Sequence, residues 1–197
     1  MADHRTLGFY TREAVAYEDR ADQHIGEAPL DRFASALPAG GDVLDFGCGS
    51  GWAAAHLRDA GFQVSAIDGS SGLAAVARER YDLDVTVMTF DAFQVEEEFD
   101  GIWASFCLLH ADRADMPDHL LRLFTALRQG GLLYLGLKEG TGSRRDHLDR
   151  LYTYFGQTEI SELLRASGFS DIRVIPFMAS GLADADEPCL HIFARRT

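Results

Sequence analysis

Residues 43–51 decide the fold and read Val43-Leu44-Asp45-Phe46-Gly47-Cys48-Gly49-Ser50-Gly51. The apolar run 43–46 predicts a buried strand, because it is short and ends at glycines. The residues from Trp52 to Ala60 predict a helix, which Gly61 closes. Glycines between a strand and a helix let the backbone approach a ligand closely and leave the helix N-terminus facing it. This stretch therefore predicts the first strand–loop–helix unit of an α/β fold.

Strands and helices alternate along the rest of the chain. Short apolar runs predict strands at 64–67, 85–88, 99–104 and 132–137, and helices are expected at 73–80, at 118–129 and between Thr158 and Gly168. This alternation predicts a Rossmann-like, doubly wound sheet with right-handed crossovers and helices on both faces. The last two strands, expected at 172–175 and 190–194, are joined by residues without a helical stripe. They should therefore pair as a hairpin, with one late strand antiparallel.

Two helices are expected ahead of the sheet. The first should run from Thr11, which can cap it, to Ile25, and the second from about Pro29 to Leu37. The proline and glycines of residues 38–41 then interrupt the chain. No internal repeat or long linker divides the sequence, so we expect a single domain over residues 1–197.

Composition narrows the class of protein. The 197 residues are 47% hydrophobic and 25% charged, which is usual for a soluble globular domain. The chain has 18 basic and 31 acidic residues and a formal net charge of −13, which argues against binding of duplex nucleic acid. Its three cysteines are far apart and form no C-x-x-C pair, so neither a disulfide framework nor a structural zinc site is expected.

The location of the protein is also constrained. The first thirty residues are rich in charged side chains, so no signal peptide is expected. No apolar stretch approaches the ~20 residues that a membrane span needs. A cytoplasmic protein without a membrane partner is expected.

The glycine loop favours one class of ligand. Gly47, Gly49 and Gly51 form G-x-G-x-G, whereas the dinucleotide fingerprint G-x-G-x-x-G would need its third glycine at position 52. That position is Trp52, whose bulk is expected to hamper a pyrophosphate. The loop therefore favours a nucleoside ligand without phosphate, and the alternative is that the glycines serve only the turn.

Two acids follow strands at spacings that suit a nucleoside. Asp68 ends the second predicted strand roughly 20 residues after the loop, where an acid accepts hydrogen bonds from ribose hydroxyls. Asp91 lies just beyond the third strand, where an acid can accept a hydrogen bond from the exocyclic amine of adenine. The alternatives are a solvated turn for Asp68 and a helix cap or turn for Asp91.

Together these residues resemble the class I S-adenosylmethionine-dependent methyltransferases. Residues 43–51 resemble that family's glycine-rich first motif, and Asp68, Asp91, the strand 99–104 and residues 128–133 are similar to its later motifs in the same order. The resemblance covers about residues 40–196. Residues 108–110 and 138–140 are similar to those of small bacterial members, including a tellurite-resistance-like branch.

The resemblance implies a cofactor, S-adenosyl-L-methionine, and the residues that bind it. The glycine loop would contact the methionyl part, Asp68 the ribose, and Asp91 with Ala92 the adenine. The implied strand order is 3-2-1-4-5-7-6 with strand 7 antiparallel, and residues 1–38 would form a helical lid on a core at 40–197. For Tyr17, core packing is the alternative to ligand contact. The expected cofactor contacts are Asp45, Gly47, Cys48, Gly49, Asp68, Gly69, Asp91, Ala92, Ser105 and Tyr17.

The methyl acceptor is less clearly indicated. Family members that methylate base amines or glutamine amides carry N/D/S-P-P-Y/F after the fourth strand, and residues 105–108 lack both prolines. Ser105 stands where metal-dependent members place an acid, so no metal site is expected. We expect a small-molecule acceptor with an oxygen, nitrogen, sulfur or other chalcogen nucleophile. Arg144, Arg145 and Arg150 are expected in a solvated loop, and the alternative is that they attract an anionic acceptor.

His110 is the candidate catalytic base. It follows the fourth predicted strand, at the end of the sheet where ligands bind in such folds, and histidine titrates near neutral pH. The alternative is a structural histidine that hydrogen-bonds its own loop. Two other functions stay open: a non-catalytic protein that binds S-adenosylmethionine, and, less favoured, a nicotinamide-dependent oxidoreductase.

Overall fold

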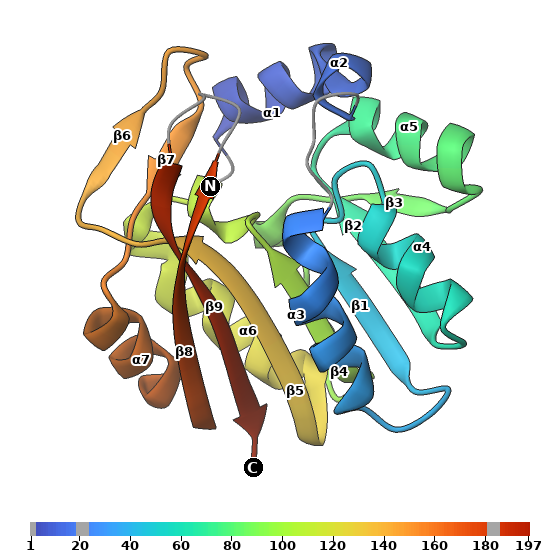
Figure 1. The fold of residues 1–197 in the computed structure, drawn as a ribbon, viewed down its shortest axis with the longest axis vertical. Coiled ribbons are helices and arrows are strands. Elements are labelled where there is room, and N and C mark those ends of the chain that lie inside the picture. Colours follow the sequence, from blue (N-terminus) through green and yellow to red (C-terminus); the bar gives the residue numbers. More distant parts are fainter. Residues whose placement is uncertain (1–2, 19–23, 181–185) are drawn as a thin grey trace.

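A seven-stranded sheet runs through the centre of the computed structural model, which describes residues 3–18, 24–180 and 186–197 (Figure 1). The strand order is β3-β2-β1-β4-β5-β9-β8. Only β9 runs antiparallel to its neighbours, while β1 to β5 pair in parallel. The predicted order and the antiparallel last strand are confirmed. The strands are β1 (Asp42–Phe46), β2 (Gln63–Asp68), β3 (Val85–Val87), β4 (Phe99–Ser105), β5 (Leu127–Lys138), β8 (Phe169–Ser180) and β9 (Asp186–Arg196).

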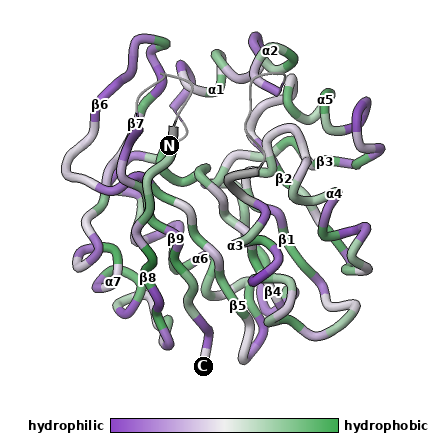
Figure 2. The backbone as a smooth tube through the Cα atoms, viewed as in Figure 1, coloured by the Kyte–Doolittle hydropathy of each residue, from purple (hydrophilic) through white to green (hydrophobic). Residues whose placement is uncertain are grey.

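Helices cover both faces of the sheet, as the alternating pattern predicts. One face carries α3 (His24–Ser35), α4 (Trp52–Asp59) and α5 (Ser71–Tyr81), and the other carries α6 (Met116–Ala126) and α7 (Gln157–Ala166) (Figure 1). The central strands are buried on both sides and therefore read as nearly continuous apolar runs. Figure 2 shows hydrophobic stretches along β5 beyond its first residues.

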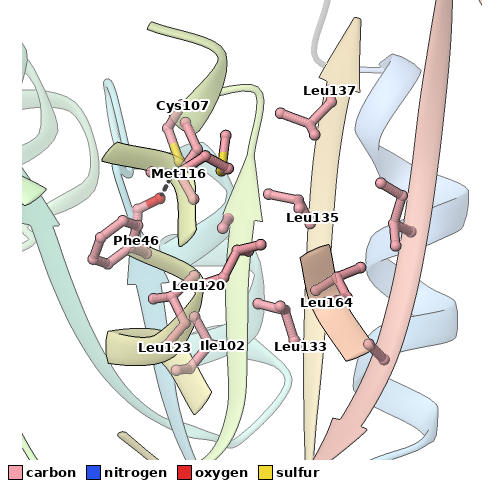
Figure 3. Close-up of a cluster of buried hydrophobic side chains, with 14 of the residues drawn as sticks. Phe46, Ile102, Cys107, Met116, Leu120, Leu123, Leu133, Leu135, Leu137 and Leu164 are labelled. Carbon is pink, nitrogen blue, oxygen red and sulfur yellow. Dashed lines mark hydrogen bonds between the residues drawn. The ribbon is translucent and has the colours of Figure 1, made fainter. Parts of the chain in front are cut away.

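The largest apolar cluster lies between the sheet and α6. Leu120 and Leu123 of α6 pack against Ile102 and Leu133 of the sheet, and all four are fully buried (Figure 3). Burial of one such side chain stabilises the fold by about 1.5–3 kcal/mol. This packing holds α6 against β4 and β5.

The N-terminal helices differ from the prediction. The expected helix from Thr11 to Ile25 is wrong: α1 (His4–Arg12) begins seven residues earlier and is followed by α2 (Ala14–Glu18), and residues 19–23 lie outside the described part of the chain. The reason is a cap that the sequence pattern did not reveal, because the carboxylate of Asp3 accepts a hydrogen bond from the backbone of Thr6. Thr11 instead lies near the end of α1, where its hydroxyl is hydrogen-bonded to that of Ser70.

The third helix packs into the core. It begins at His24, before the predicted start at Pro29. Leu30 and Phe33 are fully buried in one cluster with Trp103 of β4. Within the described part of the N-terminal segment, α1 and α2 lie above the ends of the strands (Figure 1).

Smaller differences concern the edges of elements. The helix predicted to Gln129 ends at Ala126, and residues 127–129 belong to β5, because the guanidinium of Arg128 binds the carboxylates of Asp42 and Asp100 beside the starts of β1 and β4. The last two strands are longer than predicted, and a two-stranded sheet of β6 (Ser143–Arg145) and β7 (Leu151–Thr153) was not predicted. Among the described residues, no helix is long and apolar enough to cross a membrane.

Candidate active site

A cavity lies at the carboxyl ends of the parallel strands, beneath α1 and α2. Most of the predicted site residues line it: Tyr17, Gly47, Gly49, Asp68, Gly69, Asp91, Ser105 and His110. Asp45, Cys48 and Ala92 do not line it, although they flank residues that do. The wall also contains residues that the sequence did not single out as ligand contacts, among them Thr6, Leu7, Phe90, Phe106 and His119.

The glycine loop is shaped by close contact with the loop that follows β4. Gly47 has a positive φ of 71°, and a Cβ at this position would stand 2.4 Å from the Cβ of Cys107. Any other residue would therefore push the two loops apart. By contrast, no described atom lies within 4 Å of the position that a Cβ on Gly49 would take. The loop thus closes tightly on the β4 side and leaves space at Gly49.

Asp68 ties this loop to the end of β2. Its Oδ2 accepts a hydrogen bond from the backbone N–H of Gly49 at 2.8 Å, and its Oδ1 accepts one from Ser70 at 2.7 Å. The side chain is only 8% exposed, and burial raises its pKa. Each carboxylate oxygen has a second acceptor position, so Asp68 can hold the loop and still accept hydrogen bonds from a ligand.

Asp45 is a buried acid with unused hydrogen-bonding capacity. It is 2% exposed, and its Oδ2 has no hydrogen-bond partner among the described residues. Burial, and secondarily the nearby charge of Asp68, raise the pKa of Asp45 to about 8. A cation that enters the cavity would favour the ionised form of this carboxyl group.

This predicts that binding of a cationic ligand releases a proton. At pH 7 the carboxyl group of Asp45 is mostly protonated, and it should ionise as the ligand binds; affinity should therefore rise with pH up to about 8 and then level. Calorimetric titration of S-adenosylmethionine in two buffers of different ionisation enthalpy measures the released proton. The Asp45→Asn variant is the control, and equal proton release from variant and wild type would contradict the assignment.

A second cluster of ionisable groups lies at Asp91, on the wall of the cavity. Asp91, Asp115 and His119 each offer one metal-ligand atom, and these atoms lie within 4.8 Å of one another. His119 is buried, its Nε2 lies 3.9 Å from Oδ1 of Asp91, and burial lowers its pKa. Sequence reasoning missed this juxtaposition because α6 brings His119 to the strand end from far along the chain. The expectation of no metal site stays a prediction, and a chelator experiment tests it below.

His110 lies in a chain of hydrogen bonds that joins three segments. Its Nδ1 donates to the backbone carbonyl of Leu151 at 2.6 Å, which leaves Nε2 as the acceptor for the hydroxyl of Tyr10 at 2.9 Å. The oxygen of Tyr10 in turn accepts a hydrogen bond from Arg150. Burial lowers the pKa of His110 to about 4, so the ring is neutral at pH 7 and both nitrogens are engaged.

Tyr10 and Tyr17 place aromatic rings from α1 and α2 over the cavity. Their ring centroids lie 5.1 Å apart in an edge-to-face arrangement, and both residues line the wall. Hydrogen bonds also anchor the end of α2. The carboxylate of Glu18 accepts them from the hydroxyls of Ser50 and Tyr81. The two helices are therefore fixed both to the glycine loop and to the loop after β4.

Trp52 does not act as the sequence predicted. It is the first residue of α4 and does not line the cavity, and its ring lies 5.9 Å from that of His56. The predicted steric conflict with a pyrophosphate is therefore not seen in the cavity. The absence of a glycine at position 52 still matters, because that glycine serves close helix–strand packing in dinucleotide-binding loops.

Comparisons with known proteins agree with this architecture. A family model described as a methyltransferase domain matches residues 43–131. A methyltransferase of Staphylococcus carnosus described as uncharacterized is 34% identical over 100 residues, which cover 51% of this chain and 48% of that protein. A malonyl-[acyl-carrier protein] O-methyltransferase of Enterobacter lignolyticus is 32% identical over 131 residues, covering 66% and 49%. The chain thus spans about half the length of these curated relatives.

Solved structures match over more of the chain. A Burkholderia thailandensis 1,6-didemethyltoxoflavin-N1-methyltransferase, solved with its substrate and S-adenosylhomocysteine, has a TM-score of 0.71 at 25% identity and covers 100% of this chain and 91% of that one. A Haemonchus contortus phosphoethanolamine N-methyltransferase has a TM-score of 0.80 at 19% identity, covering 97% and 60%. The second likeness is one of fold alone.

Proposed function

Because the chain belongs to the class I S-adenosylmethionine-dependent methyltransferases, we propose that it transfers a methyl group from S-adenosyl-L-methionine to a small-molecule acceptor. The observation that carries this proposal is the hydrogen bond from Gly49 to Asp68, which joins the glycine loop to the acid after β2 at the wall of the cavity. The similarity to tellurite-resistance-like members stays a prediction.

The residues present fit this cofactor. It is a cation without phosphate, and the cavity wall has acids at Asp68 and Asp91. The carboxyl group of Asp45, whose Oδ2 has no hydrogen-bond partner among the described residues, would become a buried negative group next to the loop as this cation binds. The open space at Gly49 admits a ligand close to the backbone. We propose that Asp68 holds the ribose, Asp91 the adenine amine, and the loop with Asp45 the methionyl group.

When bound, this cofactor supplies a methyl group on a positively charged sulfur. The protein then mainly has to exclude water and to orient the acceptor in line, and such orientation contributes about 7–11 kcal/mol to lowering a barrier of this kind. Tyr10 and Tyr17 cover the cavity from above, and Ser105 and Phe106 form its wall at the end of β4. We assign His110 a positioning role, since it holds Tyr10 and thereby α1 in place.

Activity is expected to be independent of added divalent metal. The proposed chemistry needs no Lewis acid, because the sulfonium is itself electrophilic. Turnover should be unchanged after treatment with a chelator. Loss of turnover that magnesium, manganese or zinc restores would contradict this expectation, and the Asp115→Asn variant would then show whether the cluster at Asp91 is responsible.

The proposed function is tested by transfer of label. The protein is incubated with methyl-labelled S-adenosylmethionine and a small-molecule metabolite extract. We expect label in at least one small molecule, and less label with the Asp68→Ala variant at a cofactor concentration that does not saturate it. A protein that binds the cofactor but transfers no label to any extract component would instead be a non-catalytic binder.

A further inference from the structure

We propose that the acceptor is an uncharged aromatic ring compound and not a carboxylate or a phosphate ester. This inference rests on the proposed function and concerns the part of the same cavity that the cofactor would leave open. Its evidence is the charge and the shape of the wall. The described residues that line the cavity include neither lysine nor arginine.

Three cations close to the wall are already bound to acids. Arg145 donates to Asp3 at 2.6 Å, and Lys138 binds the carboxylate of Glu187. The third cation, Arg150, pairs with Asp146 at 2.7 Å. Its expected place in a solvated loop is wrong, because the residue is only 2% exposed. An anionic acceptor would have to break one of these pairs to gain a cationic partner.

The remaining ionisable groups of the wall also disfavour an anion. Burial lowers the pKa of His110 to about 4, so its ring is neutral at pH 7. Three acids line the cavity: Asp3, Asp68 and Asp91. Transfer of an anion from water into such a site costs free energy that no lysine or arginine among the described wall residues offsets. An acidic carrier protein would in addition meet a chain with a net charge of −13.

Aromatic rings form the wall in place of cations. Phe106, directly after β4, has a positive φ of 52°, which a phenylalanine adopts only when its surroundings hold it there. Gly136 makes room for it, because a Cβ on Gly136 would stand 3.0 Å from the ring of Phe106. With Tyr10 and Tyr17, this ring offers apolar faces and edges against which a planar acceptor can stack.

The test measures binding of matched ring pairs to the protein loaded with S-adenosylhomocysteine. The pairs are naphthol and hydroxynaphthoate, indole and indole carboxylate, and quinolinol and its carboxylate, with phosphoethanolamine as a non-aromatic anionic probe. In at least one pair the uncharged ring should bind, and about tenfold or more tighter than its carboxylate, as expected for a charge placed among like charges. Phe106→Gly, which removes the ring and suits the backbone, should weaken that binding without changing cofactor affinity.

A charge variant sharpens the test. Asp3→Asn keeps the helix cap but removes a negative charge from the wall and releases Arg145; the carboxylates should gain affinity in this variant and the uncharged rings should not. Asp149→Asn, which removes another partner of Arg145 that does not line the cavity, is the matched control and should change neither.

The outcomes separate this inference from the proposed function. Tighter binding of carboxylates or of phosphoethanolamine, or no binding of any uncharged ring to the cofactor-loaded protein, would overturn the inference and leave the cofactor assignment standing. Failure to bind S-adenosylhomocysteine at all would overturn the proposed function first.

Discussion

Replacement of Asp68 by alanine is expected to weaken binding of S-adenosylhomocysteine by about 1.5–3 kcal/mol, the range for hydrogen bonds to a charged group. The structure gives two reasons for a large effect. Under the proposed function the carboxylate accepts hydrogen bonds from the ribose, and it already accepts those of Gly49 and Ser70. The variant therefore loses a ligand contact and also the connection that holds the glycine loop.

Calorimetry on three proteins separates these effects. Asp68→Asn keeps one acceptor oxygen at similar size and should lose less affinity than Asp68→Ala. Asp84→Ala is the matched control, because Asp84 is 96% exposed in its side chain and pairs only with Arg78 in the described structure. Equal affinity in wild type and Asp68→Ala would contradict the assignment of Asp68.

His110→Ala is expected to weaken cofactor binding and to lower thermal stability. The variant leaves the buried hydroxyl of Tyr10 and the carbonyl of Leu151 without this partner, and each unsatisfied buried group costs about 1–3 kcal/mol. A general base would behave differently: its loss would lower the single-turnover rate by ~10²–10⁴-fold and leave cofactor affinity nearly unchanged. Both quantities are measured on the same variant protein.

Tyr10→Phe independently distinguishes a positioning role of His110 from a role as general base. It removes the hydroxyl that occupies Nε2 of His110 and keeps the aromatic ring next to Tyr17. If His110 positions α1, this variant should share part of the loss of cofactor affinity seen in His110→Ala. A faster or unchanged rate with unchanged affinity in Tyr10→Phe, together with a slow His110→Ala, would show that His110 is the base.

The order of the sheet was predictable because its strands carry a simple pattern. Strands buried on both faces read as apolar runs, and each parallel pair requires a crossover that is visible as a helix. The position of Asp68 followed from the same pattern, since an acid at the end of the second strand must lie beside the loop after the first. Local sequence and fold agree in this half of the molecule.

The cover of the cavity was less predictable because it depends on contacts between distant segments. The apolar stripe after Thr11 indicated a helix in the wrong place, because the cap at Asp3 depends on one side chain. The placement of Arg150 in the interior depends on Asp146 and on rings from α1 and β7, including Tyr10 and Tyr152. The spacing of residues along the chain does not reveal such partners from distant segments.

The most direct test of the central claim is a calorimetric titration of the unmodified protein with S-adenosylhomocysteine and, separately, with NAD. The account predicts saturable binding of S-adenosylhomocysteine at one site per chain and no detectable binding of NAD, because the loop and its two acids suit a nucleoside without phosphate. Tight binding of NAD with no binding of S-adenosylhomocysteine would contradict it.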